Sequence, residues 1–156
     1  MATGKSTVGP LVARQLTVPF VDLDALIAKR AGIEVAAIFA TRGEPAFRRL
    51  EREALEIALG KGNIVLALGG GTLHQAGNLE RIQAAMDVVI LEASLETIKE
   101  RGGKDRPLWS RAEQLLAERL PIYRRAGPQI RVDNLSPEVI ASRVIAATGG
   151  GGQGWF

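Results

Sequence analysis

The sequence predicts an α/β protein in which a parallel sheet lies between two layers of helices. Two uninterrupted apolar runs, at residues 63–68 and 87–91, are typical of short strands buried on both faces of a parallel sheet. The segments between such runs carry apolar residues at helical spacing, as in residues 45–59. Strands that alternate with helices in this way favour a three-layer α/β/α arrangement.

The chain divides into one predicted domain over residues 1–147 and a glycine-rich tail over 148–156. A glycine-rich, charged segment at about 102–111 is expected to act as a mobile lid. The remaining predicted elements, in chain order, are a helix to residue 16, a strand at 20–21, helices at 25–31, 34–41, 45–59, 75–85, 95–99 and 111–125, a strand at 129–133 and a helix at 137–147.

Composition excludes several classes of function. The chain of 156 residues has no cysteine and one histidine, which rules out disulfides and thiolate chemistry and argues against a zinc site. No apolar run approaches the roughly 20 residues that span a bilayer, so we expect a cytoplasmic protein without membrane contact. The net charge is +3, but the arginines are scattered and aromatic residues make up only 4%, which argues against nucleic-acid binding. An acidic small molecule and a nucleotide would explain the basic surplus.

Gly4-Lys5-Ser6-Thr7 opens the first predicted helix and matches the second half of a phosphate-binding loop. The first N–H groups of a helix have no partner within it and point toward a bound anion. Lys5 would supply a compact positive charge, and the Ser6 hydroxyl could ligate Mg²⁺. The alternative is an ordinary helix start.

Three further groups lie where predicted strands end or helices begin. Asp22 and Asp24 follow a short strand and could hold metal-bound water and accept a proton, although aspartates there are often turn formers. Arg48, one helical turn before Glu51, could bind an acid or be an exposed helix charge. Gly69–Gly71 follow a buried strand, which suggests close backbone approach to a ligand or simply a tight turn.

In their order and spacing, these motifs resemble those of the shikimate kinases, a family that is similar to the P-loop nucleoside monophosphate kinases. The resemblance covers about residues 2–146 and rests on the motifs at 4–9, 20–24, 43–51, 67–71, 106–108 and 118–123. It implies ATP-dependent phosphorylation of the 3-hydroxyl of shikimate, with Mg²⁺ as cofactor. It also implies a monomeric enzyme of aromatic amino acid biosynthesis.

The resemblance implies a nucleotide side of the site. Lys5 would hold the phosphates of ATP, while Ser6 would ligate Mg²⁺ directly and Asp22 through water. Arg106 would swing in on the lid and neutralise charge on the transferred group, and Arg101 would stack on adenine, although its spacing from Arg106 is short for the family. The ATP-binding residues implied are Gly4, Lys5, Ser6, Thr7, Arg101, Arg106 and Pro137, the last of which is also a good first residue of a helix.

The resemblance also implies a shikimate side. Asp24 would bind the reacting hydroxyl and help to take its proton, which makes Lys5, Asp24 and Arg106 the catalytic residues. Two arginines, Arg48 and Arg119, would clamp the substrate carboxylate, and the backbone of Gly69, Gly70 and Gly71 would pack against the ring and its hydroxyls.

One feature departs from the family pattern. The strand that enters the phosphate loop, and the loop's first glycine, would lie before Met1, so we expect the first, central strand to be missing by truncation. Such a chain is expected to bind ATP weakly. Two alternatives to a shikimate kinase therefore stay open: a nucleotide-binding pseudokinase or remnant with little activity, and a kinase for another small polyol acid.

Overall fold

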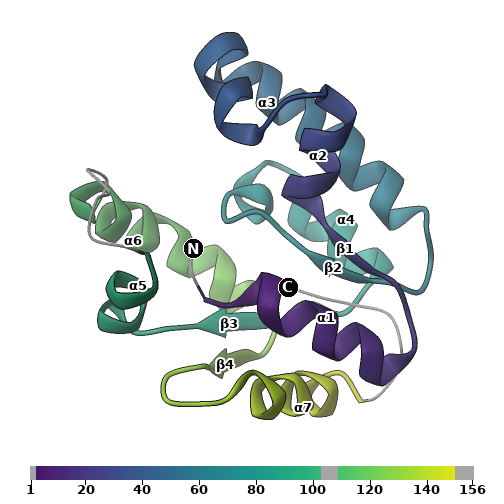
Figure 1. Cartoon of the computed structure of the whole chain (residues 1–156), viewed down its shortest axis with the longest axis vertical. Coiled ribbons are helices and arrows are strands. Elements are labelled where there is room, and N and C mark those ends of the chain that lie inside the picture. The colour runs from purple at the N-terminus through teal and green to yellow at the C-terminus, as the bar shows by residue number, and fades with distance from the viewer. Residues whose placement is uncertain (1–2, 103–108, 150–156) are drawn as a thin grey trace.

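The computed structural model describes residues 3–102 and 109–149, except for side chains between 99 and 116 other than Gln114. Figure 1 shows the arrangement of its elements. The helices are α1 (Lys5–Leu16), α2 (Leu23–Ala31), α3 (Val35–Leu59), α4 (Asn78–Ala85), α5 (Leu95–Gly102), α6 (Trp109–Ala126) and α7 (Pro137–Ala147), with a 3-10 turn, η1, at Thr72–His74. The strands are β1 (Phe20–Asp22), β2 (Val65–Ala67), β3 (Ile90–Glu92) and β4 (Gln129–Arg131).

The predicted order of strands and helices is confirmed, with corrections at several boundaries. Helix α2 begins at Leu23 rather than at 25, because the Asp22 carboxylate caps it by accepting hydrogen bonds from the N–H groups of Asp24 (3.0 Å) and Ala25 (3.2 Å). The helix expected over 75–85 begins only at Asn78, after the 3-10 turn. Residues 103–108 of the expected lid, and residues 150–156 of the expected tail, lie outside the described residues.

Helix α3 contains the two helices predicted for this region. They meet at Gly43, whose φ of 74° and ψ of 171° interrupt the helical conformation. Glycine adopts such a positive φ without steric penalty, whereas other residues rarely do. Pro45 lies in the first turn after this kink, where a missing N–H is tolerated. The kink sets the direction of the long second segment, which carries Arg48 and Glu51.

The strands form two separate parallel pairs rather than one continuous sheet. Strand β1 pairs with β2, with Phe20 opposite Val65, and β3 pairs with β4, with Ile90 opposite Gln129. In the described part of the chain, no strand pairing joins β2 to β3. A cavity of about 400 Å³ has residues from the ends of both strands in its wall, among them Leu68 and Leu91.

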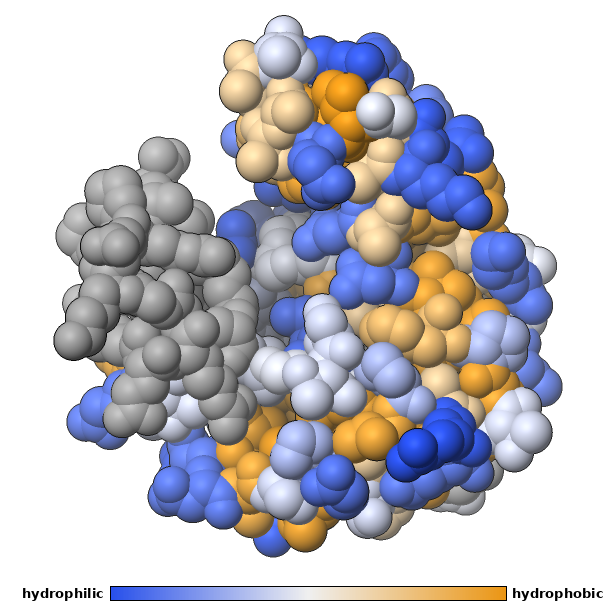
Figure 2. Space-filling view, in the orientation of Figure 1, coloured by the Kyte–Doolittle hydropathy of each residue, from blue (hydrophilic) through white to orange (hydrophobic). Residues whose placement is uncertain are grey.

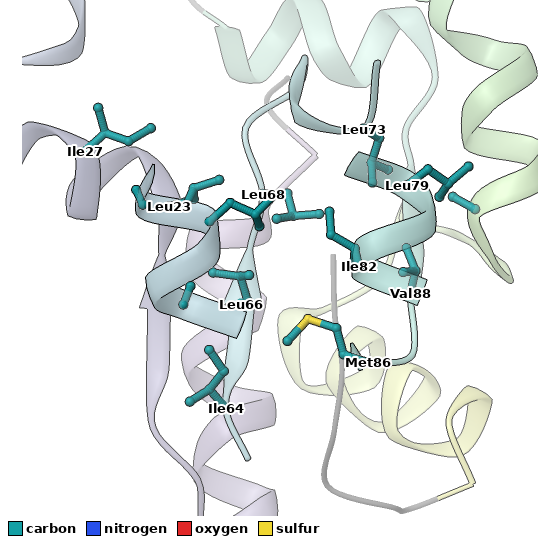
Figure 3. Close-up of a cluster of buried hydrophobic side chains, with 14 of the residues drawn as sticks. Leu23, Ile27, Ile64, Leu66, Leu68, Leu73, Leu79, Ile82, Met86 and Val88 are labelled. Atoms are coloured by element: carbon teal, nitrogen blue, oxygen red, sulfur yellow. The ribbon is translucent and has the colours of Figure 1, made fainter. Parts of the chain in front are cut away.

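Two apolar cores lie on opposite faces of the strands, as expected for a three-layer fold. On one face, α1 and α7 pack together and cover Val65, Val89 and Leu91. On the other face, α2, α3 and α4 cover Leu66 and Ile90 (Figure 3). Because neighbouring residues of a strand point to opposite faces, β2 and β3 contribute alternately to the two cores. The prediction that these strands are buried on both faces is therefore confirmed.

The outer surface is mixed in character. Figure 2 shows hydrophilic residues interspersed with hydrophobic ones on the visible face. The exposed large hydrophobic side chains of the described residues, among them Phe39 and Ile57, each expose only about two fifths of their area. Within the described residues, none of the helices combines the length and the apolar character that crossing a bilayer requires.

Candidate active site

Gly4 shapes the entry into α1. Its φ of 90° and ψ of 15° place it in the left-handed region, and it precedes the first helical residue, Lys5. The Gly4 carbonyl accepts the first bonds of the helix, from the N–H groups of Thr7 (3.0 Å) and Val8 (2.8 Å). The N–H groups of the first turn point out of the helix end, where they can bind an anion. A side chain at position 4 would strain this conformation, which explains the glycine.

Ser6 and Asp22 lie together at the start of α1 and the end of β1. The Ser6 hydroxyl donates a hydrogen bond to Asp22 Oδ2 (3.1 Å), and Asp22 Oδ1 caps α2. One hydroxyl and one carboxylate beside a phosphate-binding helix end fit Mg²⁺, which takes oxygen ligands and usually keeps several waters and substrate phosphates. Among the described residues, no cluster of three or more acidic or histidine side chains forms a closed metal cage. The predicted ligand pair is thus brought together.

Lys5 and Asp24 influence each other's charge. Burial lowers the pKa of Lys5, and the carboxylates of Asp24 and Asp22 oppose that shift. Burial, followed by the negative charges of Asp22 and Glu51, raises the pKa of Asp24 above its usual 3.8, while Lys5 and Arg48 oppose the rise. A carboxylate whose pKa is raised holds a proton more readily, which suits a proton acceptor. The two groups expected to act on the reacting atoms are therefore electrostatically coupled.

Arg48 is held in place by two carboxylates on α3. Its Nη1 donates to Glu51 Oε2 (2.8 Å), and its Nη2 donates to Glu44 Oε1 (2.9 Å). Glu51 exposes only 1% of its side chain, and its other oxygen accepts a hydrogen bond from the buried Thr72 hydroxyl (2.7 Å). The buried carboxylate is thus paired and hydrogen-bonded, as a buried charge requires. Arg48, on its helix, is thereby joined to η1 next to the glycine turn.

Two of the three glycines after β2, Gly69 and Gly71, are crowded by the side chains of the site. A Cβ added at Gly69 would lie 3.0 Å from Asp24 Oδ1 and 3.1 Å from Thr72 Oγ1. A Cβ added at Gly71 would lie 2.9 Å from Arg48 Nη2. At these two positions glycine leaves room for the neighbouring side chains, and neither residue has a positive φ. The sequence predicted that a ligand would approach the backbone of this turn closely. In the structure, the side chains of Asp24 and Arg48 lie close to it.

Helix α6 reaches the glycine turn from the other side. The Tyr123 hydroxyl donates a 2.6 Å hydrogen bond to the carbonyl oxygen of Gly70. Burial raises the pKa of Tyr123, and the charge and hydrogen bonding of the nearby Arg119 oppose that shift. Arg119 and Tyr123 are four residues apart and so lie on the same side of α6. The second arginine expected to bind an acid is thus near the glycine turn.

These contacts connect most of the predicted site. Charge interactions couple Asp24 to Lys5, Asp22 and Arg48, and both Asp24 and Arg48 lie against the glycine turn. On the other side of the turn, Tyr123 bonds to Gly70 and lies near the charge of Arg119. Arg106 lies outside the described residues, and Arg101 lies on α5 with a side chain that is not described. Pro137 is the first residue of α7 and directly follows the cap residue Ser136. This position in the helix explains a proline there without any contact to a nucleotide.

Glu51, Thr72 and Tyr123 belong to this network but were absent from the site predicted from sequence. The sequence carried a signal for two of them. Glu51 lies three residues after Arg48 and Tyr123 lies four residues after Arg119, so each shares a helix face with a predicted arginine. For Thr72, the only signal in the sequence was its position directly after the three glycines.

Comparison with known proteins agrees with this geometry. The family model for shikimate kinase matches residues 1–151. The chain belongs to the shikimate kinase family. The shikimate kinase of Mycobacterium avium is 48% identical, over 84% of this chain and 78% of the relative. That of a Sulfurihydrogenibium species is 36% identical, over 93% of this chain and 91% of the relative.

Solved shikimate kinases have the same fold. The structure from Acinetobacter baumannii, in complex with shikimate, has a TM-score of 0.87 at 32% identity and covers 93% of this chain and 86% of its own. The structure from Aquifex aeolicus has a TM-score of 0.84 at 33% identity and covers 96% and 92%. The chain is accordingly an ATP-dependent kinase that phosphorylates shikimate in the shikimate pathway, with the predicted α/β/α fold.

Proposed function

We propose that this chain transfers the γ-phosphoryl group of ATP to the 3-hydroxyl of shikimate in the site described above. The observation that carries the proposal is the convergence of Asp24, Arg48 and Gly69–Gly71. This convergence supports the proposal because a carboxylate, a guanidinium and half-buried backbone groups lie next to one another. Phosphoryl transfer needs this kind of positioning and charge neutralisation rather than a covalent nucleophile.

On the phosphate side, the N–H groups at the start of α1 and the Lys5 ammonium bind the phosphates of ATP. Burial lowers the pKa of Lys5 and the two aspartates oppose that shift, so the negative charge of a bound polyphosphate would stabilise the ammonium further. Ser6 and Asp22 would hold Mg²⁺, directly and through water, and the ion would supply positive charge against the phosphate oxygens. Arg106 adds charge neutralisation from the lid, and Arg101 and Pro137 form the adenine pocket.

On the shikimate side, Arg48 and Arg119 bind the carboxylate of the substrate. A guanidinium can donate two parallel hydrogen bonds to a carboxylate, which sets orientation as well as affinity. Asp24 accepts a hydrogen bond from the reacting hydroxyl and takes its proton as the phosphoryl group arrives. Its raised pKa makes that acceptance more favourable.

The alternatives from sequence are less well supported. A pseudokinase or remnant is not favoured, because the relatives and solved structures reported above are shikimate kinases. A kinase for another small polyol acid is not favoured either, because the family model and the relatives reported above are those of shikimate kinases. We further propose that the enzyme acts as a cytoplasmic monomer, since the contacts that build the site come from one chain; light scattering should give a mass near 16.7 kDa.

The test of this assignment uses the carboxylate itself. ADP release should depend on shikimate, and the methyl ester of shikimate should be a poor substrate because it cannot pair with the guanidinium. The Arg48→Ala variant should raise KM for shikimate about 100-fold, in line with loss of a charged hydrogen-bond partner. The same variant should change KM for the ester by less than about threefold, because that interaction is already absent. Equal penalties for acid and ester would show that Arg48 does not bind the carboxylate.

A further inference from the structure

Tyr123 joins the two sides of the acceptor pocket through a single backbone carbonyl. Its ring comes from α6, and its hydroxyl bonds to the oxygen of Gly70, 53 residues away in the chain. The bond is short at 2.6 Å, and the phenol is partly buried. Because burial raises the pKa of the phenol, the hydroxyl keeps its proton and remains the donor across the physiological pH range.

The direction of the Gly70 carbonyl determines the direction of the next N–H. A peptide unit is planar and trans, so the carbonyl of Gly70 and the N–H of Gly71 point in opposite directions. With the carbonyl turned toward α6, the Gly71 N–H turns away from that helix. Glycines are free to rotate such a peptide unit, and therefore an external bond is needed to hold one orientation.

The same residue also faces Arg119. The two are one helical turn apart on α6, and the positive charge of Arg119 opposes the rise in the pKa of the phenol. The hydroxyl of Tyr123 therefore bonds to the glycine turn close to the arginine that is proposed to bind the substrate carboxylate.

We propose that Tyr123 is a positioning residue for the acceptor: it fixes the Gly70–Gly71 peptide so that the Gly71 N–H donates to a substrate oxygen. The inference rests on the proposed function of this pocket. It assigns Tyr123 no contact with the reacting atoms. Its effect is expected in acceptor binding rather than in ATP binding.

The test is Tyr123→Phe, which keeps the ring and removes only the hydroxyl. KM for shikimate should rise about tenfold, the effect of losing one or two hydrogen bonds, while KM for ATP should stay within about twofold. The matched control is Gln83→Ala. Gln83 also anchors the last turn of α6, by donating to the carbonyls of Arg125 (3.2 Å) and Ala126 (3.0 Å), but it lies on α4 and has no bond to the glycine turn.

If Tyr123 served only to dock α6, both variants would lower the melting temperature. KM for shikimate would then be the same in both variants as in the wild type. That result would overturn the inference. The amide resonance of Gly71 gives a readout independent of turnover: shikimate should shift it in the wild type, and the shift should be lost in Tyr123→Phe. A wild type that neither binds nor phosphorylates shikimate would refute the proposed function instead. A wild type that does both, with an unchanged Gly71 shift in the variant, would refute only the role of Tyr123.

Discussion

Glu51 is fully buried and Lys5 is half-buried, and the two ionisable side chains lie in different kinds of surroundings. Glu51 belongs to the acceptor side, which comprises Arg48, Glu51, Thr72 and the glycine turn, and both of its oxygens have direct partners at 2.7–2.8 Å. Lys5 belongs to the phosphate side, which comprises residues 4–7 and Asp22. Its influences there are burial and the charges of the two aspartates.

The difference indicates how each side is prepared for its ligand. The acceptor side is preorganised, because its charges are neutralised by one another before substrate arrives. On the phosphate side, Lys5 lies in the wall of a cavity of about 400 Å³ and gains favourable charge interactions when an anion binds. Substitutions on the phosphate side should therefore reduce turnover without loss of stability, whereas substitutions that remove a paired charge from the acceptor side should reduce stability as well.

The largest effect is expected at the junction of the two sides. Asp24→Asn should lower kcat by about 10²- to 10⁴-fold, the usual range for a positioned proton acceptor. The variant should be at least as stable as the wild type at pH 7, because a raised pKa means that the folded state disfavours the ionised carboxylate. Steady-state kinetics and thermal unfolding measure the two quantities.

The pH dependence gives a second check on Asp24. As pH falls through its raised pKa, Asp24 takes up a proton and cannot accept another, so kcat/KM should fall at a pH above the usual 3.8. Over the same interval the folded state loses the unfavourable charge, and the contribution of this group to stability improves. If kcat/KM of the Asp24→Asn variant fell at low pH as it does in the wild type, a group other than Asp24 would be responsible for the fall.

Lys5→Met should lower kcat about 100-fold, as loss of one preorganised charge at the transferred group typically does. Its melting temperature should stay the same or rise, because burial disfavours the ammonium. Lys29→Met, at an exposed position of α2, is the control and should leave kcat unaltered. A clear loss of stability in Lys5→Met would remove the contrast between the two sides.

Glu51→Gln should combine a moderate kinetic effect with a loss of stability. Without the negative charge, Arg48 loses its buried partner, and we expect KM for shikimate to rise about tenfold and unfolding free energy to fall by about 2 kcal/mol. The control is Glu56→Gln on the same helix, whose bond to Arg81 (2.8 Å) is exposed and should contribute less than about 1 kcal/mol. Similar denaturant midpoints for the two variants would contradict the preorganised acceptor side.

The smallest effect is expected at Gly71. In Gly71→Ala the new methyl group would meet the guanidinium of Arg48, at the far end of a flexible side chain that can move. KM for shikimate should rise about threefold while stability changes by less than about 1 kcal/mol, within the range of ordinary surface substitutions. Gly60→Ala, where the added atom would meet backbone at 3.4 Å and φ is negative, should leave KM unchanged. A larger effect on KM for ATP than for shikimate would contradict the placement of Gly71.

Local patterns in the sequence were sufficient for the elements and for the family. Apolar runs predicted strands such as β2, helical spacing predicted α3 on both sides of its kink, and the Ser136-Pro137 pair predicted the start of α7. These features depend on neighbours along the chain and on burial, so they can be read in one dimension. The roles of Lys5, Asp24 and Arg48 came from the resemblance to the family, and they stay predictions until the variants are measured.

Only the tertiary structure decided which polar groups meet. Glu44 and Glu51 flank Arg48 almost symmetrically in the sequence, yet only Glu51 is buried. Its carboxylate accepts a hydrogen bond from the buried Thr72 hydroxyl of η1, a partner that Glu44 does not have. The bond from Tyr123 to Gly70 and the division of the strands into two pairs likewise depend on segments far apart in the chain. Hydrophobic periodicity determines which face of a helix turns inward, but it does not determine what that face meets there.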